Sequence, residues 1–76
     1  MRYAIEIEHL NGNVGAYAPD VPGVGVTAAT PEEAQELLRE ALIMQFEALV
    51  EDGEPIPQPK TVISAHSVEV SLPTVA

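Results

Sequence analysis

Acidic side chains are the first group in this sequence whose type and spacing could support catalysis. Glu6 and Glu8 alternate with apolar residues and could meet carboxylates from later segments, namely Glu36, Glu40 or Glu69. Clustered carboxylates of this kind can hold two magnesium ions for phosphodiester cleavage. A metal-dependent nuclease is therefore one alternative, although Glu6 and Glu8 are expected to point away from the sheet face that a helix would cover.

Histidine and serine give weaker indications of chemistry. His9 and His66 are the two histidines, and they approach one another only if the first and last strands pair. Two histidines alone fall short of a typical zinc ligand set. The serines near the end of the chain follow a strand-like spacing without the glycines of a nucleophile elbow. We therefore expect no catalytic residue, no metal site and no cofactor, and hence a protein that is not an enzyme.

The strongest compositional feature is the excess of acid. The 76 residues carry 12 Asp or Glu against 3 Lys or Arg, which gives a formal net charge of −9. Because nucleic-acid binding requires cations that neutralise phosphates, direct DNA or RNA binding is disfavoured, as is binding to an anionic membrane. A basic protein partner would instead be attracted electrostatically. The alternative is that the excess acid merely keeps the protein soluble.

The sequence shows neither a targeting segment nor a membrane span. Charged residues interrupt the first apolar positions at Arg2 and Glu6, and no stretch approaches the length that crosses a bilayer. The chain contains no cysteine, so no disulfide can stabilise its small core. We expect a cytoplasmic protein. We also expect a homo-oligomer, because a domain of this size buries little apolar surface by itself.

Alternation and turn residues predict three strands in the first part of the chain. Apolar and polar residues alternate over 2–8, which indicates a half-buried strand. The segment 11–13, Asn-Gly-Asn, suits a tight hairpin because Asn and Gly tolerate positive φ. A second strand is expected over 14–18 and a third over 24–28, with Pro22-Gly23 at the centre of a type II turn between them.

A helix is predicted over residues 31–52. Thr30 is expected to cap it, Pro31 suits its first position, and Glu33 completes a capping box. Gly53 should end the helix in the left-handed conformation. The residues expected on its core-facing side are Ala34, Leu37, Leu38, Ala41, Leu42, Gln45, Ala48 and Leu49.

The rest of the chain completes the predicted fold. Prolines over 55–60 indicate a stiff extended connector, and a last strand is expected over 61–72 with Val62 and Ile63 on opposite faces. The order β-β-β-α-β gives an α+β fold, a two-layer sandwich of one long helix on a four-stranded sheet, in a single domain over 1–76. We expect the last strand to lie beside the first and parallel to it, through a right-handed crossover.

Two surfaces are predicted to bind other chains. The sheet face turned away from the helix would carry Ala4, Glu6 and Tyr17, and we expect an oligomer face there because it is too apolar for water. The helix would overhang the shorter strands, where either the connector or a partner covers Phe46 and Val50. The acidic residues there lie at the unfavourable end of the helix dipole. The predicted partner-binding residues are Phe46, Glu47, Val50, Glu51, Asp52 and Glu54.

Several segments, taken in order and spacing, resemble the N-terminal domain of HicB-type antitoxins. They are 17–23 (YAPDVPG), 30–34 (TPEEA), 40–42 (EAL), 51–53 (EDG) and 56–59 (IPQP), and the match covers most of 3–60. The resemblance implies a truncated ribonuclease-H-like fold without that fold's catalytic role. It also implies binding to a small basic mRNA-cleaving toxin of the HicA type, whose active surface the antitoxin covers, and usually an oligomeric state.

Full-length members of that family carry a C-terminal DNA-binding module that represses their own operon. The sequence ends at Ala76 without such a module, so we do not expect autorepression. The leading hypothesis is an antitoxin-like binding module with a basic HicA-like toxin as its partner. The alternative is a solitary self-assembling structural or small-ligand-binding domain without a toxin.

Overall fold

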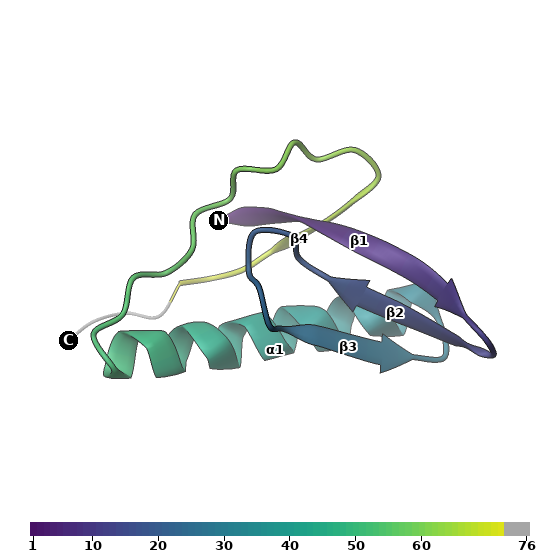
Figure 1. Cartoon of the computed structure of the whole chain (residues 1–76), viewed down its shortest axis with the longest axis horizontal. Coiled ribbons are helices and arrows are strands. Elements are labelled where there is room, and N and C mark those ends of the chain that lie inside the picture. Colours follow the sequence, from purple (N-terminus) through teal and green to yellow (C-terminus); the bar gives the residue numbers. More distant parts are fainter. Residues whose placement is uncertain (73–76) are drawn as a thin grey trace.

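The computed structural model describes residues 1–72. Its elements follow in the order β1 (Arg2–Leu10), β2 (Asn13–Tyr17), β3 (Gly25–Ala28), α1 (Pro31–Glu51) and β4 (His66–Glu69). The strands form one sheet in the order β3-β2-β1-β4, and α1 packs across one face of it (Figure 1). The predicted two-layer α+β fold is therefore confirmed.

Glycines with positive φ make the turns between the first three strands. Gly12, between β1 and β2, has a φ of 77°, and Gly23, between β2 and β3, has a φ of 86°. Glycine reaches this region at little cost because it lacks a Cβ atom. The β1–β2 hairpin brings Leu10 opposite Asn13 beside the turn and Glu6 opposite Tyr17 at its far end. Both turns lie where the sequence predicts them.

The start of α1 is fixed by the predicted cap. Thr30 is extended, and its Oγ1 accepts a hydrogen bond from the Glu33 N–H at 3.2 Å. Pro31 occupies the start of the helix, where a backbone N–H would have no acceptor within the helix, so that proline costs no hydrogen bond. Glu32 and Glu33 lie in the first turn, where the positive end of the helix dipole favours negative charge.

The core lies between α1 and the inner face of the sheet. Helix residues spaced four apart are fully buried, namely Ala34, Leu38, Leu42 and Phe46. The apolar stripe is narrower than the predicted one, since Leu37 is 42% exposed. The sheet and its adjoining segments contribute the other buried side chains, Tyr3, Ile5, Val14, Ala16, Ala18, Val21, Val68 and Val70.

The last strand differs from the prediction. β4 spans only His66–Glu69 and pairs antiparallel with β1, so the parallel pairing, its crossover and the range 61–72 are wrong. The reason is the connector, residues 52–65, which is long enough to run back along the sheet before the chain turns into β4 (Figure 1). Val62 and Ile63, expected in the strand, are exposed on this connector.

Two sets of hydrogen bonds hold the connector to the rest of the fold. Asp20 accepts the Lys60 and Thr61 N–H groups and the Thr61 hydroxyl, each at 2.8 Å. These donors, the Thr61 N–H foremost, lower the pKa of Asp20. The Tyr3 hydroxyl donates to the Pro57 carbonyl at 2.7 Å, and burial raises the pKa of Tyr3. The proline-rich segment is therefore docked on the fold.

Candidate protein-binding surfaces

The first candidate surface is the acidic tip, which we define as Glu47, Glu51, Asp52 and Glu54. All of these residues are exposed. In Figure 1 the last turns of α1 extend past the ends of β2 and β3, so the acidic tip lies at the end of the molecule. No basic residue occupies the last turn of α1, although cations are favoured at the negative end of a helix dipole.

The backbone N–H groups that follow the end of α1 at the acidic tip form hydrogen bonds to helix carbonyls. Gly53 has a φ of 71°, and its N–H donates to the Val50 carbonyl at 3.2 Å. The Glu54 N–H donates to the Leu49 carbonyl at 2.8 Å, which completes a Schellman motif. The helix therefore ends in a fixed geometry, as predicted for Gly53, and the carboxylates around it are presented on a rigid support.

Both arginines and the N-terminal amino group pair with carboxylates outside the acidic tip. Arg39 pairs with Glu36 one turn away, which lowers the pKa of Glu36 and raises that of Arg39. Glu69 pairs with the Met1 amino group at 3.0 Å and with Arg2 at 3.5 Å, and its pKa is lowered chiefly by the hydrogen bond from the amino group. Across residues 1–72, no ion pair includes a residue of the acidic tip.

Phe46 is a core residue, and its predicted role as a partner anchor is wrong. Its side chain is 0% exposed, and its ring centroid lies 5.5 Å from that of Tyr3 in a tilted arrangement. Tyr3 is in turn held by the Pro57 carbonyl of the connector. The chain's own segments therefore cover this flank of the helix, which was the alternative left open by the sequence. Val50 is half-buried at the same end of α1.

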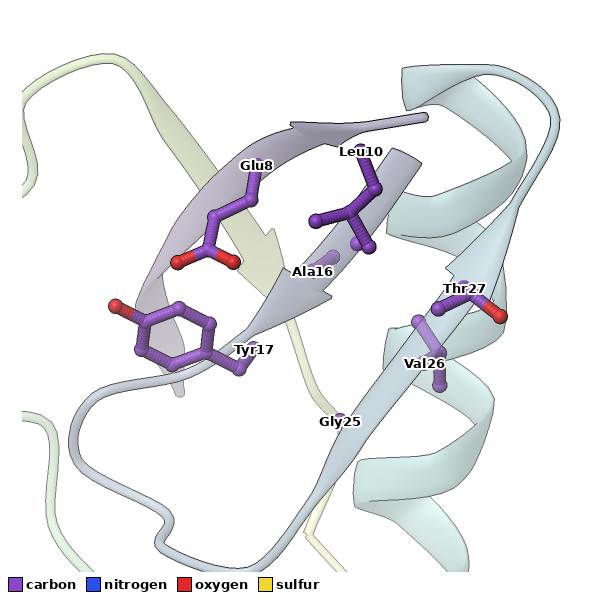
Figure 2. A pocket seen from close by; sticks show the side chains of 8 residues that line it. Glu8, Leu10, Ala16, Tyr17, Gly25, Val26 and Thr27 are labelled. Atoms are coloured by element: carbon purple, nitrogen blue, oxygen red, sulfur yellow. The ribbon is translucent and has the colours of Figure 1, made fainter. Parts of the chain in front are cut away.

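The second candidate surface is the open sheet face, the side of β1, β2 and β3 turned away from α1. Glu6 and Tyr17 are cross-strand partners there, and both are exposed as predicted. Ala4 is 4% exposed, so the expectation that it contributes surface to an oligomer face is wrong. This face carries an open hollow of about 370 Å³, whose lining side chains are drawn in Figure 2. It is lined by Glu8, Leu10, Gly15, Ala16, Tyr17, Gly25, Val26 and Thr27.

Sequence reasoning missed this hollow and a second one beside it. The second lies between β3 and the helix and is lined by Gly23, Val24, Gly25, Ala41, Met44 and Gln45. Met44 is 69% exposed at its rim. The available signals were the glycines inside or next to predicted strands, Gly15, Gly23 and Gly25. A further signal was the spacing of Ala41, Met44 and Gln45, which places these three residues on one side of the helix.

The residues singled out for catalysis are not brought together. His66 is opposite Ile5 in β1, and its Nδ1 lies 3.2 Å from the Gln35 amide nitrogen, whereas His9 is opposite Val14 in β2. Within residues 1–72, no group of three or more His, Cys, Asp or Glu side chains has the geometry to hold a metal ion. In the same residues, no helix is both long enough and apolar enough to cross a membrane.

Comparison with known proteins identifies the family. Residues 3–72 match the model of the HicB-like antitoxins of bacterial toxin-antitoxin systems. This chain therefore belongs to the HicB-like antitoxin family, as the sequence resemblance predicted.

Individual relatives agree with this assignment. Antitoxin HicB 1 of Photorhabdus laumondii subsp. laumondii is 40% identical over 63 residues, which are 82% of this chain and 41% of that protein. Antitoxin HicB 2 of the same organism is 34% identical over 61 residues, which are 80% of this chain and 44% of that protein. The chain thus spans less than half the length of these curated relatives.

Solved structures share the fold. A chain in a HicA3 and HicB3 toxin-antitoxin complex superposes with a TM-score of 0.69 at 31% identity, over 80% of this chain and 72% of that one. The crystal structure of the Burkholderia pseudomallei antitoxin HicB gives a TM-score of 0.68 at 30% identity, over 86% of this chain and 48% of that one. The β-β-β-α-β architecture is therefore that of known HicB proteins.

Proposed function

We propose that this domain is an antitoxin module that neutralises a small basic mRNA-cleaving toxin of the HicA type by covering the toxin's active surface. The observation that carries the proposal is the acidic tip, which is exposed and forms no ion pair within the described residues. Membership of the HicB-like family and the likeness to a chain from a HicA3–HicB3 complex support it. The proposal places the domain in the cytoplasm, where such a toxin meets its mRNA substrate.

The acidic tip suits a cationic partner for electrostatic reasons. Carboxylates clustered at the negative end of a helix dipole create a local negative potential that attracts and orients a basic surface. Val50, which is half-buried and precedes Glu51 in the sequence, would add apolar contact area to this surface. The proposed partner-binding residues are Glu47, Val50, Glu51, Asp52 and Glu54.

The test reverses the charge of the acidic tip. The variant with Glu47→Lys, Glu51→Lys and Asp52→Lys is expected to abolish binding of the cognate HicA-type toxin, measured by calorimetry and native mass spectrometry at low salt. Its circular dichroism spectrum should stay that of the folded domain, because all three side chains are exposed.

A matched control separates local from global charge. Glu32→Lys, Glu33→Lys and Glu40→Lys change the net charge equally but lie away from the acidic tip, and this variant should retain most of the affinity. Equal loss in both variants would assign the effect to net charge, and undiminished binding in the first variant would remove the acidic tip from the interface. Failure of the unaltered domain to bind the toxin would overturn the proposed function.

Self-association is the second candidate function, and one observation favours it. Leu10 and Tyr17 are 48% and 41% exposed on the open sheet face, where a second copy could cover them. The proposed oligomer face consists of Glu6 and Tyr17 with their exposed neighbours. Light scattering coupled to size-exclusion chromatography should then report an oligomer that Tyr17→Lys dissociates, and a monomer at all concentrations would eliminate this role.

A further inference from the structure

We propose that the hollow in the open sheet face is a binding site for an arginine side chain of the basic protein partner. This inference rests on the proposed function for the identity of the partner. The hollow combines a carboxylate, an exposed aromatic ring and an apolar wall above a glycine floor. Each of these parts matches one part of an arginine side chain.

The glycine floor is the first argument. Glu8 is opposite Gly15 and Tyr17 is opposite Gly25, so a glycine faces each of the two larger side chains across the strands. Neither glycine has positive φ, and a Cβ atom at Gly25 would come no closer than 3.7 Å to its neighbours. The backbone therefore does not require glycine at these positions.

Glycine inside a strand weakens the sheet, and it often marks a place where a ligand approaches the backbone closely. A Cβ atom at Gly15 would meet the Leu10 Cδ1 atom at 3.4 Å, so even alanine would begin to fill the space beside Leu10. The effect of both glycines is to keep the hollow open between Glu8, Tyr17 and Thr27.

The side chains around the floor are the second argument. In Figure 2 the Glu8 carboxylate and the Tyr17 ring lean toward the same side of the hollow, and Leu10 lies along another side. A guanidinium group stacks on aromatic rings and pairs with carboxylates through its fixed fork of donors. The aliphatic stem of the same side chain would lie along Leu10.

The charge of the face is the third argument, and it selects the occupant. Glu6, opposite Tyr17, adds a second exposed carboxylate to that of Glu8, and no basic residue lines the hollow. A second copy of this chain, the alternative occupant of this face considered above, itself carries a net charge of −9 and would bring further negative charge to Glu6 and Glu8. Like charges placed opposite one another repel. A cationic side chain is instead attracted to the carboxylates of Glu6 and Glu8.

The direct test is a titration of the isotopically labelled domain, followed by NMR, with N-acetylarginine amide and with its neutral analogue N-acetylcitrulline amide. Saturable shifts are expected at the amides of Gly15, Tyr17, Gly25 and Thr27 with the arginine compound and not with citrulline. Nα-acetyllysine amide, which keeps its ε-ammonium group, should bind about threefold more weakly than the arginine compound, because an ammonium group lacks the planar fork of donors.

Three variants locate the binding site. Glu8→Gln and Tyr17→Leu should each weaken binding of the arginine compound by about threefold or more, because each removes one contact with the cation. Glu40→Gln, on the helix layer, removes the same charge as Glu8→Gln and should leave the titration unchanged. Equal shifts with citrulline, or unchanged affinity in both Glu8→Gln and Tyr17→Leu, would overturn the inference.

A measurement with the toxin separates this inference from the proposed function. The Glu8→Gln, Tyr17→Leu double variant should bind a HicA-type toxin about tenfold more weakly, with its fold checked by circular dichroism. Binding with unchanged affinity would refute the hollow as part of the interface and leave the proposed function intact. If the toxin fails to bind even the unaltered domain, the proposed function fails, and the arginine titration still decides whether the hollow takes a cation.

Discussion

The two ends of α1 follow opposite electrostatic rules. At its start, Thr30 caps the helix and Glu32 and Glu33 complement the dipole. At its end, Glu51 and Asp52 oppose the dipole, and no basic residue lies in the last turn. Both ends carry capping hydrogen bonds, so the contrast in charge does not arise from a missing cap.

The fold depends on the stabilising features at the start of α1, whereas it tolerates the unfavourable charges at the end of α1. The start of the helix combines a threonine cap, an N-terminal proline and acidic residues in the first turn, each of which stabilises an isolated helix. The end is held by packing, since Phe46 and Tyr3 form an aromatic contact beneath the exposed carboxylates. Because packing inside secures this end, its outer surface is free to carry unfavourable charge, and such a departure from a local rule is typical of a functional surface.

The largest effect is expected from removing the packing at the C-terminal end. Phe46→Ala should lower the free energy of unfolding by about 3–5 kcal/mol, because it leaves a cavity against Tyr3. Urea denaturation followed by circular dichroism measures this loss. Phe46→Leu, which keeps much of the volume, should cost far less. A small effect of Phe46→Ala would show that packing does not secure this end of the helix.

A moderate effect is expected from removing the cap at the N-terminal end. Thr30→Ala should lower the free energy of unfolding by about 1 kcal/mol, since the Glu33 N–H loses its acceptor. Thr30→Ser retains the oxygen and serves as the control in the same denaturation experiment. If both variants lose equal stability, the hydroxyl group is not what stabilises this end.

The smallest effect has the opposite sign and concerns the charges at the C-terminal end. Glu51→Gln and Asp52→Asn should each raise the free energy of unfolding by about 0.3–1 kcal/mol at low ionic strength, because they remove charges that oppose the dipole. The gain should shrink as salt is added. Neutral variants that are no more stable than the original would show that these charges carry no stability cost.

Much of the fold over residues 2–51 was predictable because its signals are local. Alternation defines β1, glycines define the turns after β1 and β2, and Thr30 and Gly53 define the ends of α1. Each of these features depends on residues within a few positions of one another. The family resemblance likewise rested on short segments that occur in the chain in the order typical of HicB-type antitoxins.

The direction of β4 was not predictable from local signals. It depends on the route of the connector, which is set by hydrogen bonds from Lys60 and Thr61 to Asp20 across about 40 positions of the sequence. The burial of Phe46 was hidden for the same reason, because its partner Tyr3 lies in the first strand.

The candidate surfaces differ in the same way. The acidic tip could be predicted because its residues adjoin one another in the sequence and follow a helix end marked by Gly53. The hollow could not, because it needs the register that places Gly15 opposite Glu8 and Gly25 opposite Tyr17. Glycine in a strand is visible in a sequence, but its neighbours across the sheet are not.

The position of β4 at the edge of the sheet also has a consequence for how the domain opens. β4 contributes four residues at one edge of the sheet, pairs only with β1, and has far less contact with α1 than β2 and β3 have. Segments with the fewest buried contacts open at the lowest free energy. We therefore expect β4 and the connector to separate from the helix layer more easily than β2 and β3 do, although Val68 and Val70 belong to the core.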